Sequence, residues 1–407
     1  MHNQAGRKLT CAILALTTGL LFPLTSCNTG GDTDMTDEPI DTASITSITS
    51  ETSDTQATDN TAPGPIINPT GTSANWFDEG IDVNIEITGY STYQGEYPGL
   101  FLSPGDKVAV LSPSSLPSEE QLNKTIEGLS EWGFVPVAGQ HVFEIGRTVE
   151  DCREDLITAL NDPEIKAIFC VRGGYGSSEV MDIMTDDMIN LIRNSHKLII
   201  GFSDITVYHS AWSVAGIPSV HATMSGAFTE LSDTCIEAER NLIMGQVPSY
   251  RCDTDEYCIK GSAEGVLIGG NLFTMTAVIN TAYDCTKAGK PYILFVEEVG
   301  EDIQHIHRFL EVLKHAGVLE RASGIVFGEW TEIPSDFGGY GGDSRGGEFR
   351  SVEDMIAREF LKEYNKPVAF GFPAGHSDKV NYPLLMGQTA RLSVTDSNYT
   401  LEWTGLV

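Results

Sequence analysis

From about residue 105 onward, hydrophobic residues recur in short runs, and each run is followed by a stretch with helical spacing. The run over 107–111 has the length and apolar character of a buried strand. The next stretch, 118–132, opens on Ser118 with acidic residues in its first turn, as helices often do. Strands that alternate with helices favour a parallel sheet covered on both faces. By the same pattern we expect strands over 134–137, 165–171 and 197–200, and helices over 149–161, 178–192 and 205–215.

A second alternating series begins near residue 263. Before it, residues 244–261 contain Pro248, two cysteines and several acidic side chains, which is the composition of a connection. The pattern therefore predicts an α/β protein with an N-terminal, parallel-sheet, Rossmann-like domain over 96–245, a linker over 246–262 and a C-terminal mixed α/β domain over 263–407. In the second domain we expect strands over 263–268, 292–296, 325–327, 368–370 and 390–394, and helices over 271–279, 303–315 and 352–363.

The N-terminus has the features of an export signal. Arg7 and Lys8 precede an apolar run over 9–24, which is short for a membrane-spanning helix and is interrupted by polar residues and a proline. The run leads into Leu-Thr-Ser-Cys, which resembles the lipobox of bacterial lipoproteins. That resemblance implies a signal peptide over 1–27, a diacylglycerol on Cys27, and an extracytoplasmic protein anchored to the bacterial cell membrane. The alternative is an ordinary signal peptide that happens to contain a cysteine.

The segment 28–95 is rich in Thr, Asp, Ser, Asn and Pro, and it contains no Lys, Arg or His. Such a composition buries too little apolar surface to offset the entropy of ordering, so we expect a disordered tether. Toward its end Ile81, Val83, Ile85 and Ile87 alternate with polar residues. That alternation indicates a strand or a packed extension there.

Charge and cysteine content exclude several classes of partner. A formal net charge of −32 over 407 residues argues against nucleic acid and against electrostatic docking on anionic lipid, so any membrane attachment has to be hydrophobic. The eight cysteines fall to six if Cys11 leaves with the signal and Cys27 is acylated. Export permits disulfides, and Cys252 and Cys258 are close enough in sequence to close a small loop. No C-x-x-C pair occurs, so we expect no zinc site, and we predict no cofactor.

Ser203 is the first candidate for chemistry. It lies between the apolar run 197–200 and the helix expected from residue 205, and Gly201 would permit a tight turn. A serine at such a strand-to-helix turn presents its hydroxyl beside backbone amides and the positive end of a helix. The alternative is that Ser203 or Asp204 only caps the helix. The second glycine of G-x-S-x-G is missing.

A glycine-rich loop, Arg172-Gly-Gly-Tyr-Gly176, directly follows the strand that ends at Val171. Glycines at this place let backbone N–H groups approach a ligand. The loop lacks the third glycine of a dinucleotide-binding motif and the lysine of a P-loop. From the motif alone, an oxyanion-binding loop fits as well as a phosphate-binding one.

Two further candidates lie in the second domain. Glu297 and Glu298 end the strand over 292–296, and neighbouring strand residues face opposite sides, so one of them can point into a given site. His376 lies in a loop rich in glycine and proline, where it would serve as a general base. An exposed strand end and an exposed loop histidine are the simpler alternatives. His305 and His307 are two residues apart on a helix and make a poor metal pair.

Together these segments resemble the LD-carboxypeptidase family of serine peptidases, which includes the microcin-immunity peptidases. Five motifs occur in the family's order, at 172–176, 201–206, 269–272, 295–297 and 371–376. The resemblance implies a Ser–Glu–His triad in the cleft between the domains. It assigns the nucleophile to Ser203, the carboxylate to Glu297, the base to His376, the oxyanion hole to the backbone amides of Gly174 and Asp204, and substrate binding to Arg172, Tyr175 and Asn271.

The resemblance also implies an activity. Members hydrolyse the bond between an L-centre and a terminal D-residue, as in the release of D-alanine from murein tetrapeptide, and they often form homodimers. Residues 221–224 read His-Ala-Thr-Met where the family often has His-Gly-Pro-Met, and the glycine-rich stretch 338–347 has no assigned role. The alternatives are a related peptidase that acts on an antibiotic or another small peptide amide, and a non-catalytic peptide-binding lipoprotein.

Overall fold

The computed structural model describes residues 84–97, 99–182, 187–224, 230–334 and 349–405. The predicted signal peptide with Cys27, most of the predicted tether and the glycine-rich stretch 338–347 lie outside the described residues. Within these described ranges, no helix combines the length and the apolar character needed to cross a membrane.

The first sheet has six strands in the order β12-β6-β5-β4-β2-β3. Its five N-terminal strands are parallel, and the late strand β12 (Leu384–Met386) adds to the edge in antiparallel direction. The predicted Rossmann-like arrangement is thus confirmed. The other strands are β2 (Lys107–Leu111), β3 (Val135–Ala138), β4 (Ile165–Cys170), β5 (Leu198–Gly201) and β6 (Ser219–His221), and the helices are α1 (Glu119–Glu131), α2 (Val149–Asn161), α3 (Ser177–Asp182), α4 (Asp187–Ser195) and α5 (Thr206–Ala215).

The second sheet has eight strands in the order β1-β7-β14-β13-β8-β9-β10-β11. The sheet is mixed. Strands β8, β9, β10 and β11 are parallel to one another, whereas the pairs β1–β7, β7–β14, β14–β13 and β13–β8 are antiparallel. The strands are β1 (Ile85–Thr92), β7 (Gln246–Asp253), β8 (Gly261–Asn271), β9 (Tyr292–Val299), β10 (Gly324–Thr331), β11 (Val368–Ala369), β13 (Thr389–Val394) and β14 (Asn398–Trp403), and the helices are α6 (Asp233–Ile243), α7 (Leu272–Val278), α8 (Ile303–His315), α9 (Val318–Arg321) and α10 (Val352–Glu359).

Two segments predicted as connections contain strands. The predicted linker 246–262 is mostly strand, since β7 spans Gln246–Asp253 and β8 begins at Gly261. Four residues of β7 are buried, Val247, Pro248, Tyr250 and Cys252. The proline and the polar residues made the segment resemble a connection. The predicted tether ends in β1, at the alternating isoleucines, and β1 pairs with β7. Cys252 and Cys258 both carry free thiols in the structure, so they do not close the loop that their spacing allows.

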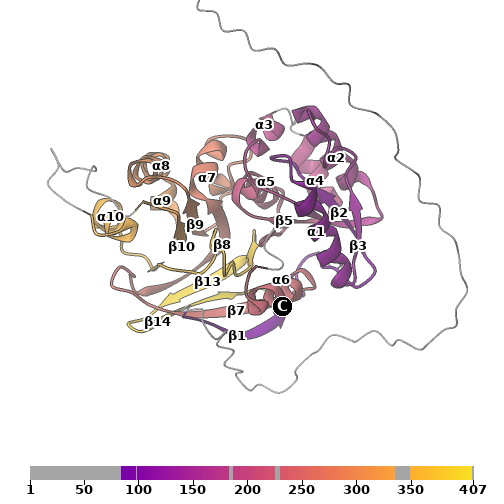
Figure 1. Ribbon diagram of the computed structural model, residues 1–407. Coiled ribbons are helices and arrows are strands. Elements are labelled where there is room, and N and C mark those ends of the chain that lie inside the picture. Colours follow the sequence, from indigo (N-terminus) through magenta and orange to yellow (C-terminus); the bar gives the residue numbers. More distant parts are fainter. Residues whose placement is uncertain (1–83, 98, 183–186, 225–229, 335–348, 406–407) are drawn as a thin grey trace, which may run out of the picture. The chain divides into compact units, whose positions relative to one another are not determined.

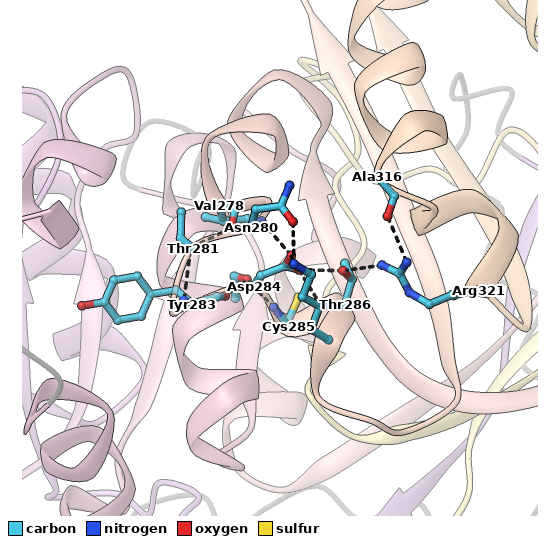
Figure 2. A network of polar contacts seen from close by, with 11 residues as sticks. Val278, Asn280, Thr281, Tyr283, Asp284, Cys285, Thr286, Ala316 and Arg321 are labelled. Carbon is cyan, nitrogen blue, oxygen red and sulfur yellow. Dashed lines mark hydrogen bonds and ion pairs between the residues drawn. The ribbon is translucent and has the colours of Figure 1, made fainter. Parts of the chain in front are cut away.

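Helix α5 joins the two sheets, because it follows β5 and packs against β8 and α7 (Figure 1). At its middle, Ser210 Oγ donates to the carbonyl of Tyr283 at 2.5 Å. The turn at Tyr283 is itself braced by Asp284, whose carboxylate accepts from the amides of Asn280 and Thr286 at 2.8 and 3.0 Å (Figure 2). This polar network holds the connection between α7 and β9 against the first domain.

Candidate active site

Ser203 lies on a strained turn at the carboxyl end of β5. Its φ is +63°, in the left-handed region that a residue with a Cβ seldom adopts, and Gly201 before it has a φ of +153°. A short 3-10 helix, Ser203–Ile205, then leads into α5. A helix-capping serine has extended backbone angles and accepts a hydrogen bond from the first turn. Ser203 does neither, so the capping alternative does not apply.

Asp204 does not cap α5 either, because its carboxylate points back to the first sheet. It accepts from Ser114 Oγ at 2.5 Å and from the amide of Ser177 at 2.9 Å. Ser114 follows β2 and Ser177 begins α3. The carboxylate thus joins three loops at the carboxyl edge of the parallel sheet, where open α/β sheets bind their ligands.

The glycine-rich loop after β4 packs directly against the nucleophile candidate. A Cβ on Gly173 would lie 2.9 Å from Ser203 Cβ and 3.1 Å from Ser203 Oγ, so only glycine fits there. Gly174 has a φ of +105°, and a Cβ on it would lie 2.3 Å from Ser115 Oγ. The loop is therefore pressed between Ser203 and the loop after β2. This close approach brings its backbone to the serine hydroxyl, as an oxyanion-binding loop requires.

Arg172 and Tyr175 present exposed side chains on this loop. The Arg172 guanidinium donates to the carbonyl of Leu116 at 3.1 Å, and the Tyr175 hydroxyl donates to Glu179 at 3.1 Å. Tyr175 is 65% exposed. Both side chains lie at the rim of the loop and are accessible to a ligand, and their predicted role in substrate binding stays a prediction.

Glu297 and His376 form a pair inside the second domain. Glu297 lies in the buried part of β9 and has no exposed surface, and its Oε2 lies 2.8 Å from His376 Nδ1. A carboxylate accepts hydrogen bonds, so in the neutral imidazole Nδ1 carries the proton and Nε2 keeps its lone pair. Burial opposes the charged imidazolium, but the neighbouring carboxylates, above all Glu297, outweigh it and raise the pKa of His376 above its usual 6.5.

The Glu297–His376 pair contacts the turn that carries Ser203 through the side chain of Phe202. The His376 imidazole packs on the Phe202 ring with 4.7 Å between ring centroids, and Phe202 directly precedes Ser203. Among the described residues, Ser203 Oγ makes no hydrogen bond. Such contacts are often long before substrate binds, so the geometry is compatible with a serine–histidine pair that tightens on binding.

Asn271 makes structural hydrogen bonds at the start of α7, and its predicted role in substrate binding stays a prediction. Its side-chain oxygen caps α7 through the amide of Thr274 at 3.1 Å, and its Nδ2 donates to Glu298 at 2.7 Å. The residue is 5% exposed. Glu298 faces away from Glu297, as expected for neighbours on a strand, and burial raises its pKa to about 7.

Glu329 is a further residue of the candidate site, and no motif in the sequence pointed to it. It lies on β10 beside Glu297, and its Oε2 accepts from the amide of Ser377, next to His376, at 3.1 Å. An acidic residue just after the apolar run 325–327 was the available signal, but it resembles any exposed strand end.

Family models match both domains of the chain. The LD-carboxypeptidase N-terminal domain matches residues 108–222, and the LD-carboxypeptidase C-terminal domain matches residues 264–392. The chain belongs to the LD-carboxypeptidase family. The nucleophile turn lies in the first match, and the Glu297–His376 pair lies in the second.

Among curated relatives, the chain is 28% identical over 300 residues to the murein tetrapeptide carboxypeptidase of Pseudomonas aeruginosa, with 70% of this chain and 92% of that protein covered. It is 25% identical over 316 residues to the microcin C7 self-immunity protein of Escherichia coli, covering 68% and 87%. Among solved structures, the muramoyltetrapeptide carboxypeptidase of Oxalobacter formigenes has a TM-score of 0.61 at 22% identity and covers 73% of this chain and 98% of its own. At 22% identity the structural match supports the fold alone.

Proposed function

We propose that the protein is a serine carboxypeptidase that hydrolyses L,D-peptide bonds of murein peptides and releases the terminal D-alanine of tetrapeptide stems. The observation that carries the proposal is the placement of Ser203 at a strained turn next to the buried Glu297–His376 pair. Supporting it, a relative covered over most of its length is named murein tetrapeptide carboxypeptidase.

In this mechanism Nε2 of His376 takes the proton of Ser203 Oγ as the oxygen attacks the carbonyl carbon of the scissile bond. Glu297 holds the imidazole in the required tautomer and stabilises its charged form. The tetrahedral intermediate collapses as the imidazolium gives its proton to the leaving amine of D-alanine. Water, activated by the same imidazole, then hydrolyses the acyl-enzyme and restores Ser203.

The oxyanion of the intermediate would be bound by the backbone amides of Gly174 and Asp204. The tight packing of the glycine-rich loop on Ser203 supports this assignment, since donors fixed in advance stabilise developing charge without reorganisation. Because the pKa of His376 is raised, the neutral base form is lost already as pH falls toward 6.5. We expect activity to decline on that acidic side.

We further propose that the mature protein is held at the outer face of the cell membrane through a lipid on Cys27. The order of basic residues, apolar run and lipobox-like sequence supports this. Cells fed a labelled fatty acid should transfer label to the wild-type protein and not to Cys27→Ser. Equal labelling of both proteins, or none in either, would contradict the anchor without touching the catalytic proposal.

The catalytic test uses the full-length protein in detergent with purified murein tetrapeptide, and mass spectrometry follows the loss of D-alanine. We expect release by the wild type and none above background by Ser203→Ala. If neither protein releases D-alanine, the proposed substrate is wrong. Aspartyl sulfamoyl adenosine, which is bound in a solved structure of a microcin C7 self immunity protein, is then tested next. Release that persists in Ser203→Ala would remove Ser203 as the nucleophile.

A further inference from the structure

Glu329 holds the loop that carries His376 on both sides of the histidine. Its backbone amide donates to the carbonyl of Ala374 at 3.1 Å, and its carboxylate accepts from the amide of Ser377 at 3.1 Å. Glu329 of β10 is thus hydrogen-bonded to the chain two residues before His376 and one residue after it. Because β10 pairs with β9, which carries Glu297, the histidine and its carboxylate partner share one rigid support.

The histidine loop packs closely against β9 and β10, so that side chains larger than glycine do not fit at two positions. Gly375 has a φ of +155°, and a Cβ on it would lie 3.1 Å from the Cβ of Glu329 and 3.4 Å from Oε2 of Glu297. A Cβ on Gly328 would come within 3.1 Å of the Cβ of Glu297. Glycines therefore let two carboxylate-bearing strands close on the histidine loop, and Glu329 is part of that contact.

The charge of Glu329 also bears on the imidazole. Burial, together with the charge of Glu297, raises the pKa of Glu329 to about 7 against the opposing effects of the Ser377 amide and of His376. Glu329 in turn helps to raise the pKa of His376. The charge of each group therefore affects the protonation of the other. The charged or titratable groups that act on this pair are Glu297 and Glu298 from β9, His221 from β6 and Asp378 from the histidine loop itself.

We propose that Glu329 is a positioning residue for His376: it fixes the loop through its two hydrogen bonds, and its carboxylate charge favours the imidazolium. The effect on turnover rests on the proposed peptidase function, whereas the effect on the imidazole does not. We therefore choose one readout for each.

The first measurement follows the ring signals of His376 by NMR against pH in the full-length protein, with His376→Asn to assign them. Glu329→Gln keeps an oxygen for the Ser377 amide and removes the charge. We expect it to lower the pKa of His376. Glu332→Gln removes an exposed charge just beyond β10 and should leave that pKa unchanged.

The second measurement is the pH profile of kcat/KM on murein tetrapeptide. In Glu329→Gln the acidic limb should move to lower pH while kcat on the plateau stays near that of the wild type. In Glu329→Ala the loop also loses its side-chain anchor, and kcat should fall by up to about 100-fold, as for a misplaced catalytic group.

An unchanged pKa of His376 in Glu329→Gln, equal to that in Glu332→Gln, would overturn the proposal even if the enzyme is fully active. A wild-type protein without activity on the tetrapeptide would count against the proposed substrate alone, because the NMR titration needs no turnover. Should Glu329→Ala fail to fold, the titration of Glu329→Gln still decides.

Discussion

The backbone of Ser203 is the most strained feature of the candidate active site. A residue with a Cβ in the left-handed region is less stable by about 1–3 kcal/mol, and such strain persists only where the surroundings enforce it. Here Gly173 presses against the side chain, and the Thr206 hydroxyl donates to the Ser203 carbonyl at 2.7 Å. The strained turn places the Ser203 side chain against the glycine-rich loop, beside Phe202, whose ring packs on His376.

This strain predicts an inverted preference between glycine and alanine at position 203. Glycine adopts the left-handed conformation without a steric penalty, so Ser203→Gly should be more stable than Ser203→Ala by about 1 kcal/mol. Urea denaturation of the two variants measures the difference. At Ser213, inside α5, the same pair should show the ordinary helical order with alanine more stable. Equal stabilities at position 203 would mean that the turn relaxes and stores no strain.

At the scale of elements, the site depends on how the end of β8 meets the start of α5. Thr206 Oγ1 accepts from the amide of Asn271 at 2.9 Å while it donates to the Ser203 carbonyl. The approach is so close that a Cβ on Gly270 would lie 2.3 Å from Thr206 Oγ1. The nucleophile turn of one sheet is thereby tied to a strand of the other sheet, next to the strand that carries Glu297.

Gly270→Ala should therefore push the end of β8 away from the start of α5. The new methyl group has to displace Thr206, and the φ of +139° at this position adds strain. We expect a loss of about 2–3 kcal/mol in the free energy of unfolding and at least about a tenfold drop in kcat/KM. Gly89→Ala on β1 is the matched control, because nothing lies within 4 Å of its Cβ. A Gly270→Ala protein with wild-type activity would show that the contact between α5 and β8 does not position Ser203.

The same scale shows which elements can be predicted from the sequence. Buried parallel strands such as β4 and β5 are continuous apolar runs, so both were predicted within a residue or two. Strand β7 has one solvated face and contains Pro248, and its alternating pattern was interpreted as a linker. The helix predicted over 178–192 is divided between α3 and α4.

At the scale of the whole molecule, buried ionisable groups make stability depend on pH in opposing directions. Glu239 on α6 is fully buried and accepts from the amide of Thr223, and its burial raises its pKa from 4.5 to about 8. Its folded-state pKa is the higher one, so its contribution is complete below about 4.5 and is lost as pH rises through 8. Burial lowers the pKa of His209 to about 4, so its contribution is complete above 6.5 and is lost as pH falls through 4.

Glu239→Gln should remove the alkaline part of this dependence. The amide keeps an oxygen for the Thr223 amide and carries no charge to bury. Between pH 5 and pH 8 its free energy of unfolding should rise relative to that of the wild type, by an amount on the order of a few kcal/mol. Urea denaturation at several pH values measures the difference, with Glu237→Gln on the exposed side of α6 as the control. Parallel pH profiles for wild type and Glu239→Gln would contradict the prediction.

The sequence by itself determined the alternation of strands and helices, the two α/β domains and the candidate residues Ser203, Glu297 and His376, because these depend on local pattern and on motifs. Tertiary structure decided the rest. Glu297 and His376 are 79 residues apart in sequence. They meet because β9, β10 and β11 are neighbours in one sheet and the loop that carries His376 follows β11. Sheet order likewise places β1 and β12 beside strands distant in sequence, turns Asn271 toward Glu298, and brings Glu329 against the histidine loop. Such pairings depend on which strands share an edge, and no local pattern of residues encodes that choice.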